Sequence, residues 1–119
     1  MARIVNANKP SRGDVWMADL DPTLGREQSG RRPVFILSVN RFNHGPAELV
    51  IVIPMTTRSK GIPYHVEVVP PDGGLQQLSF IKCEDVRSIS TSRLFRKCGT
   101  TSEAVLSLVE HQIRLLLGL

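Results

Sequence analysis

The chain has 119 residues, of which 41% are hydrophobic and 22% are charged, as is typical of a single globular domain of ordinary size. Its 15 basic and 11 acidic residues give a net charge of +4, which favours an anionic partner such as nucleic acid without requiring one. The two cysteines and three histidines lie far apart in the sequence and fit neither a zinc ribbon nor a disulfide framework, so we expect no metal and no cofactor.

The amino-terminal sequence lacks the apolar segment of a signal peptide. The longest apolar run, residues 49–55, is too short to cross a bilayer, so we expect a cytoplasmic protein that does not bind membranes. Residues 1–11 are predicted to form a polar tail, and residues 12–119 a single domain.

Two strands are expected in the first part of the chain, at residues 13–21, where polar and apolar residues alternate, and at residues 33–39, where a nearly continuous apolar run favours a central strand. Between them lies the loop GREQSGRRPV, residues 25–34, with three arginines and two glycines. Because the planar guanidinium of arginine grips phosphate well, this loop is either a phosphate site or a solvated turn.

A turn at residues 40–47 leads to a strand at 48–55, and a polar loop leads to another strand at 64–69. The sequence Asp72-Gly73-Gly74 predicts a turn, followed by a long strand over 78–89 that bends in its polar middle. Residues 91–99 are predicted to form a short helix that Gly99 ends.

The last segment has the apolar spacing of an amphipathic helix, with Ser102 as its N-cap. We expect its core face to consist of Val105, Leu108, Val109, Ile113 and Leu116. Several short strands followed by one helix predict a mainly β fold with α, namely a small antiparallel barrel packed by a terminal helix.

Four segments in order and at matching spacing, RGDVWMADLDPTLGREQSGRRPV, IPMTT, IKCEDVRSI and RLFRKCGTTSEAVLSLVEHQIRLLLGL, resemble the MazF/PemK (Kid) family of toxin–antitoxin systems. The resemblance runs from residue 12 to the carboxyl terminus. It implies a Src-homology-3-like barrel with a carboxyl-terminal helix that works as a homodimer. It also implies a sequence-specific, metal-independent endoribonuclease that cuts single-stranded RNA and is neutralised by a cognate antitoxin.

The family pattern places the catalytic arginine at Arg32, before Pro33, and the catalytic threonine at Thr56. It also places Glu27 at a position tied to RNA contact or catalysis. Further RNA-binding residues expected from the resemblance are Arg26, Gln28, Arg31, Thr57, Arg58, Lys60, Lys82 and Glu84.

The chain departs from the family pattern at two positions. Arg26 stands where serine or histidine is common, and Glu84-Asp85 stands where relatives have an acidic residue followed by glutamine. Substrate preference and the identity of the general base, Glu27 or Glu84, therefore stay open.

Each assignment has a structural alternative. Arg32 could only pair with Glu27, and Thr56 could simply end a strand. Glu84 and Asp85 could pair with Lys82 and Arg87 across the sheet. Trp16 is expected in the core or a dimer interface, and His65 on a strand surface.

Two other functions fit the same fold. One is a CcdB-like toxin that poisons DNA gyrase by protein binding, without chemistry. The other is an RNA-binding barrel that has lost catalysis.

Overall fold

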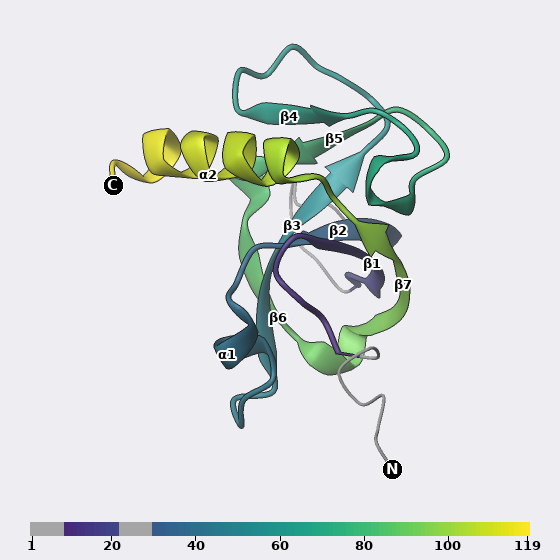
Figure 1. Cartoon of the computed structure of the whole chain (residues 1–119), viewed down its shortest axis with the longest axis vertical. Helices are drawn as coiled ribbons and strands as arrows, with labels where there is room; N and C mark the ends of the chain where they lie inside the picture. The colour runs from purple at the N-terminus through teal and green to yellow at the C-terminus, as the bar shows by residue number, and fades with distance from the viewer. Residues whose placement is uncertain (1–8, 22–29) are drawn as a thin grey trace.

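The computed structural model describes residues 9–21 and 30–119. In this part of the chain a strongly bent antiparallel sheet carries one long helix on one side (Figure 1). The strands are β1 Asp14–Asp19, β2 Arg31–Ile36, β3 Leu49–Thr56, β4 His65–Val68, β5 Ser79–Lys82, β6 Arg87–Ser90 and β7 Leu94–Thr100. The helices are α1 Asn40–Asn43 and α2 Glu103–Leu117, with 3₁₀ turns η2 Asp72–Gly74, η3 Cys83–Asp85 and η4 Thr91–Arg93.

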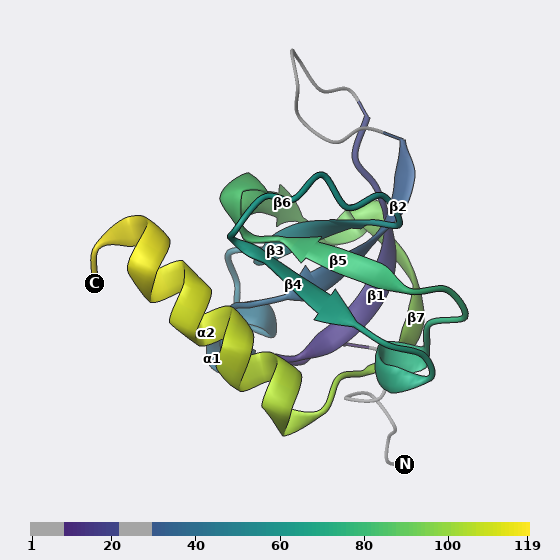
Figure 2. The same cartoon turned by 90° about the horizontal axis from the view of Figure 1, so that it is seen from above.

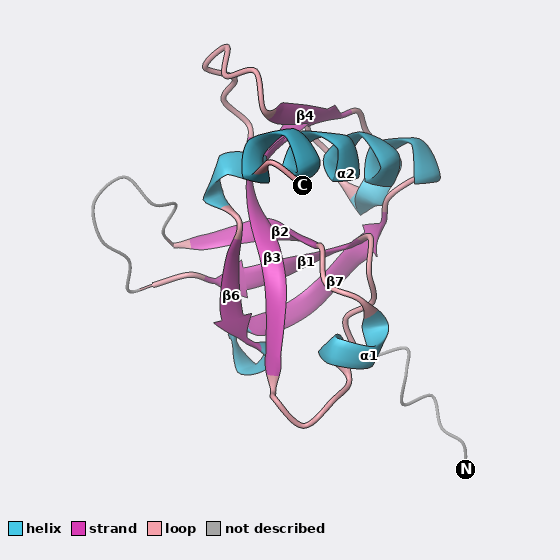
Figure 3. Ribbon diagram, turned by 90° about the vertical axis from the view of Figure 1, so that its left-hand side faces the viewer, coloured by secondary structure: helices cyan, strands magenta, loops and turns pink. Residues whose placement is uncertain are grey.

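The strand order is β4-β5-β3-β2-β1-β7, and β6 also pairs with β3. Figure 3 shows the strands curling beneath α2 into a half-open barrel. The expected fold class, a small antiparallel barrel-like sheet with a carboxyl-terminal helix, is confirmed.

The sheet separates two apolar clusters, because side chains along a strand alternate between its faces. On β2, Phe35 points toward α2, whereas Val34 and Ile36 point into the curl of the sheet. The first cluster is completed by residues of α2, and the second by β1, β3 and β6. Each fully buried aliphatic or aromatic side chain contributes about 1.5–3 kcal/mol, so this alternation fixes which face each strand turns inward.

Helix α2 begins and ends as its sequence predicts. Ser102 Oγ accepts a hydrogen bond from the Val105 N–H at 3.3 Å, and Gly118 ends the helix at φ 71°. The predicted core face is right for Val105, Val109 and Ile113, which are buried.

The prediction for Leu108 was wrong, because this side chain is 53% exposed. The buried positions follow one another every four residues, so α2 touches the sheet along a narrow stripe. Leu108 lies at the margin of that stripe, and Leu106 packs partly against the core on the other side.

The helix predicted for residues 91–99 is also wrong. After the single turn η4, β7 pairs antiparallel with β1 through two irregularities of register. Pairing with the otherwise open edge of β1 outweighs the local helical preference. Gly99 does not end a helix; a Cβ there would lie 2.7 Å from the backbone of Gly73, so the glycine lets two backbones meet.

The bend predicted within residues 78–89 is confirmed. Turn η3 interrupts the run and divides it into β5 and β6, which pair with opposite halves of β3. The strand predicted at 33–39 is β2, which begins two residues earlier than expected, at Arg31, and ends at Ile36. Within the described residues, the helices are too short or too polar to span a membrane.

Candidate functional site

Arg32 and Thr56 lie on the neighbouring strands β2 and β3. Strands β2 and β3 pair with Val34 opposite Pro54. The paired stretch ends there; continued by two residues on each strand, the same register would place Arg32 opposite Thr56 on the face of Val34. Both residues are half-buried, Arg32 near the start of β2 and Thr56 at the end of β3.

The neighbouring strands complete a row across the sheet. Ala18 of β1 lies opposite Arg32, and Phe80 of β5 lies opposite Thr56. Figure 2 shows β3 and β5 running side by side, with β4 beyond them. Pairing with β5 fixes the position of Thr56 more firmly than a loop would.

The Thr56 hydroxyl is oriented by the loop that follows it. Its Oγ1 accepts a hydrogen bond from the Arg58 N–H at 3.2 Å. The hydroxyl proton is therefore available for a bond to a ligand oxygen. Thr57, Arg58 and Lys60 are all exposed on this loop, where their side chains can reach an anionic ligand.

Hydrogen bonds join the two ends of the loop that precedes Arg31 and Arg32. Gly30, at φ 77°, donates its N–H to Asp21 Oδ1 at 2.9 Å and accepts from the Leu20 N–H at 3.0 Å. These bonds fix the start of β2 and hence the two arginines. The other residues predicted in this loop, Arg26, Glu27 and Gln28, lie outside the described residues.

Lys82 and Glu84 are held within the protein. The Lys82 side chain is 9% exposed, and its Nζ lies 3.1 Å from Asp85 Oδ2, an ion pair without the geometry of a hydrogen bond. The ion pair between Asp85 and Lys82, expected as the structural alternative to a role in the site, is therefore present. RNA binding by Lys82 stays a prediction, and it would require this side chain to move.

Glu84 is bound to a histidine that was predicted on the surface. The His65 side chain is only 4% exposed, and its Nε2 lies 2.8 Å from Glu84 Oε2, so that prediction was wrong. Turn η3, which carries Glu84, packs against β4, which carries His65. His65 Nδ1 and Glu84 Oε1 are buried without hydrogen-bond partners among the described residues. Each of these two atoms can therefore still take part in one further hydrogen bond.

Neither cysteine thiol is activated as a nucleophile. Cys83 is fully buried, and burial, followed by the negative charge of Glu84, raises the pKa of its thiol to about 12. Burial also raises the pKa of Cys98. Both thiols stay protonated near neutral pH, and neither forms a disulfide. Across residues 9–21 and 30–119, no three histidine, cysteine or acidic side chains gather in a way that could hold a metal ion.

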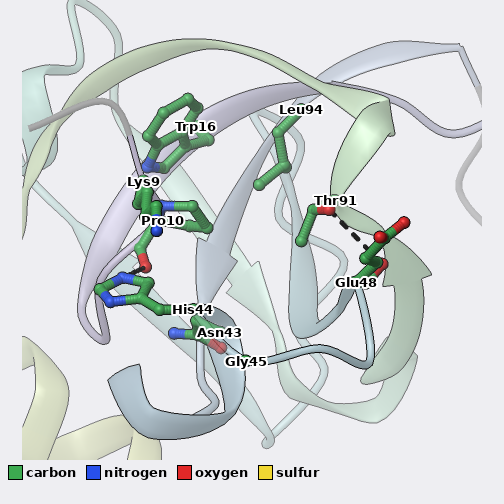
Figure 4. Close-up of a pocket in the computed structure, with 9 residues that line it drawn as sticks. All are labelled: Lys9, Pro10, Trp16, Asn43, His44, Gly45, Glu48, Thr91 and Leu94. Carbon is green, nitrogen blue, oxygen red and sulfur yellow. Dashed lines mark hydrogen bonds between the residues drawn. The ribbon is translucent and has the colours of Figure 1, made fainter. Parts of the chain in front are cut away.

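A cavity of about 310 Å³ lies away from this site (Figure 4). Its wall includes Trp16, which is 7% exposed. Trp16 belongs to the core, which was one of the two places expected for it, the other being a dimer interface. The His44 ring bonds to the Pro10 carbonyl at 2.8 Å, and Thr91 bonds to the Glu48 carbonyl. None of the predicted site residues that the structure describes lines it.

Two further cavities flank the start of β2. One, of about 340 Å³, includes Pro33, Thr57 and Arg96 in its wall. The other, of about 470 Å³, includes Arg31 and Phe95. Phe95 and Arg96 were not predicted as site residues, because residues 91–99 were expected to form a helix; β7, LFRKCGT, has no alternating pattern that would have indicated a strand.

The whole domain matches a known family. Residues 11–117 match the model of the PemK-like, MazF-like toxins of type II toxin–antitoxin systems. Among curated proteins, the chain is 34% identical to endoribonuclease MazF9 of Mycobacterium tuberculosis over 91% of this chain and 96% of the relative. It is 33% identical to the endoribonuclease toxin MazF of Escherichia coli over 97% of this chain and 100% of the relative.

Solved structures agree. MazF of Deinococcus radiodurans superposes with a TM-score of 0.82 at 28% identity, covering 93% of this chain and 98% of that one. A MazE–MazF structure from the same organism gives 0.77 at 28% identity, covering 92% and 96%. The half-open barrel, the terminal helix and the matched sequence define a small bacterial-type toxin domain. The chain belongs to the PemK- and MazF-like toxins of type II toxin–antitoxin systems.

Proposed function

We propose that this protein is the endoribonuclease toxin of a toxin–antitoxin pair and that it cuts single-stranded RNA without a metal ion. The observation that carries the proposal is the antiparallel pairing of β2, which carries Arg32, with β3, which ends at Thr56, in a chain whose relatives are named endoribonucleases. The CcdB-like alternative is not favoured, because the matching relatives carry the ribonuclease name.

The chemistry uses the RNA's own 2′-hydroxyl. A base removes the 2′ proton, O2′ attacks the adjacent phosphorus, and the 5′ oxygen leaves with a proton. The products are a 2′,3′-cyclic phosphate and a free 5′-hydroxyl. The pentacoordinate phosphorus carries two negative charges at the transition state, so preorganised cationic donors accelerate the step most.

Arg32 fits the electrostatic task. Its guanidinium stays charged at any working pH and can hold two phosphoryl oxygens at once. Thr56 can donate its hydroxyl proton to a phosphoryl oxygen, because the Arg58 N–H already occupies an acceptor position of Oγ1. Together they bind the reacting phosphate from adjacent strands.

The general base is a carboxylate, and the candidates are Glu27 and Glu84. Glu84 has support from its contact with His65, since an imidazole at 2.8 Å orients the carboxylate and can exchange a proton with it. Glu27 rests on the family pattern. The variants Glu84→Gln and Glu27→Gln distinguish which of the two carboxylates is the base.

Exposed cations extend the site along the RNA. Arg31, Arg58 and Lys60 are exposed and can contact backbone phosphates, which also makes binding depend steeply on salt. We place the reaction in the cytoplasm because its proposed substrate is messenger RNA.

A cognate antitoxin and a second copy of the chain are the proposed protein partners. The antitoxin is supported by the MazE–MazF structure that this fold matches. Homodimerisation is supported by apolar side chains left exposed at the end of α2, where Leu115, Leu117 and Leu119 are 59%, 55% and 80% exposed. Sedimentation at micromolar concentration should show a dimer.

Incubating the purified protein with a long single-stranded RNA and EDTA tests the function. We expect discrete fragments at an unchanged rate. A gyrase poison or a non-catalytic RNA-binding barrel would leave the RNA intact, and loss of cleavage upon chelation would contradict the metal-free mechanism.

A further inference from the structure

An exposed aromatic ring lies next to the candidate site with a cation over its face. The Arg31 guanidinium carbon is 5.1 Å from the centroid of the Phe95 ring, and Phe95 is 49% exposed. The pair borders the cavity of about 470 Å³, whose wall comprises Asp19, Asp21, Arg31, Ser92, Arg93 and Phe95. An exposed phenylalanine in contact with an arginine offers a flat surface to a planar ligand.

The surrounding strands hold this surface in place. Asp19 of β1 lies opposite Arg31, and Arg93 Nη1 donates to the Asp19 carbonyl at 3.0 Å and to the Asp21 carbonyl. These bonds fasten turn η4, and with it the start of β7 where Phe95 lies, to the end of β1. The wall of the cavity is thus built by four elements, β1, β2, η4 and β7, that are bonded to one another.

Polar groups in the same cavity accept hydrogen bonds. Asp19 Oδ1 accepts from the Asp21 N–H at 3.1 Å, and Asp21 Oδ1 accepts from the Gly30 N–H at 2.9 Å. In each carboxylate these bonds involve only one oxygen. The second oxygen of each can accept an N–H from a ligand.

We propose that this cavity is a nucleobase subsite of the enzyme, in which a base next to the cleaved nucleotide adds to the Arg31–Phe95 stack. This inference rests on the proposed function. Arg31 and Arg32 are successive residues at the start of β2, so their side chains leave opposite faces of the strand at the same end of the sheet, and an RNA that crosses this end can contact both. Stacking on aromatic and guanidinium planes is how proteins hold unpaired bases.

The carboxylates give the subsite a preference. Adenine, cytosine and guanine present an exocyclic amino group that can donate to Asp19 or Asp21. Uracil presents two carbonyl oxygens, which a carboxylate repels, and only one ring N–H. The subsite therefore favours a base with an amino group over uracil.

Binding of a non-cleavable RNA tests the proposal. The RNA carries a 2′-O-methyl group at the cleaved nucleotide, and its dissociation constant is measured at fixed salt for the full chain and its variants. Phe95→Ala and Phe95→Leu should each weaken binding by about 5- to 150-fold, because both remove the flat ring. Phe95→Trp should bind about as well as the parent protein, and its fluorescence should be quenched by the RNA.

Leu108→Ala is the matched control, since it removes an exposed apolar side chain of α2 and should leave RNA affinity unchanged. Uracil placed at one flanking position should weaken binding to the parent protein, and weaken it less in Asp19→Asn. Thermal unfolding checks that each variant keeps its fold.

The outcomes separate this inference from the proposed function. If the parent protein neither binds nor cleaves RNA, the proposed function fails and the subsite with it. If the parent protein cleaves RNA but Phe95→Leu binds as tightly, or the fluorescence of Phe95→Trp ignores RNA, only the subsite is overturned.

Discussion

Val34 and Pro54 lie opposite each other where antiparallel strands β2 and β3 pair, two residues from Arg32 on one strand and two residues from Thr56 on the other. A rigid pair of strands, rather than a loop, therefore sets the spacing between the guanidinium and the hydroxyl. That spacing makes each residue separately testable, because substitutions at either one leave the apolar clusters untouched.

Arg32→Ala should lower the cleavage rate by about 10²- to 10³-fold or more, because it removes the charge that stabilises the phosphorane. The thermal unfolding midpoint should change little, since Arg32 is half-buried and contributes no core volume. Arg32→Lys, which keeps the charge but not the fork, should recover only part of the rate. A folded Arg32→Ala protein that cleaves normally would remove Arg32 from the mechanism.

Thr56→Val keeps the shape of the side chain and loses the hydroxyl, so we expect a drop in single-turnover rate of about 10²-fold for one lost donor. Thr56→Ser restores the hydroxyl and should restore most of the rate. If the valine variant cleaves like the parent protein, Thr56 only ends a strand.

The two candidate bases are distinguished by Glu84→Gln and Glu27→Gln. Glu84→Gln keeps a polar group beside His65 but cannot accept a proton as a carboxylate does. If Glu84 is the base, Glu84→Gln should lose cleavage and the part of the pH–rate profile that reports titration of the base. Glu27→Gln should then keep the cleavage activity and that part of the profile. The reverse result assigns the base to Glu27.

Glu84→Ala measures the structural part of the same contact. It leaves His65, whose side chain is 4% exposed, without its bonded partner, so the free energy of unfolding should fall by about 1–3 kcal/mol. Chemical denaturation gives this value, and Glu67→Ala on the exposed face of β4 is the control. Equal stability of both variants would show that the His65–Glu84 bond contributes little.

Stability should decrease at alkaline pH through Cys83. The folded pKa of its thiol is raised from 9.0 to about 12, so the folded state retains a proton that the unfolded state releases. The contribution is complete below pH 9 and is lost as the pH rises from about 9 to about 12. Urea unfolding should show a steeper loss between pH 8 and 10 for the parent protein than for Cys83→Ala; equal slopes would contradict the raised pKa.

Most strands and the terminal helix could be predicted because apolar periodicity and caps are local signals, whereas the family came from the resemblance of four sequence segments to known toxins. The register was not a local signal, and neither was the pairing of β7 with β1, which turns a segment with helical character into a strand. His65 shows the same limit, since an alternating strand pattern says nothing about the turn η3 that folds over one face. Phe95 became a candidate only when the sheet set it beside Arg31.

The ends of the RNA products test the central claim most directly. If the 2′-hydroxyl attacks the phosphorus, every upstream fragment carries a 2′,3′-cyclic phosphate and every downstream fragment a free 5′-hydroxyl. A substrate with 2′-deoxy or 2′-O-methyl at the cleaved nucleotide should bind and stay intact. Mass spectrometry of the fragments formed in EDTA should show these ends, whereas 5′-phosphate ends, or cleavage of the 2′-O-methyl substrate, would mean that water attacks and that Arg32 and Thr56 do not work as described.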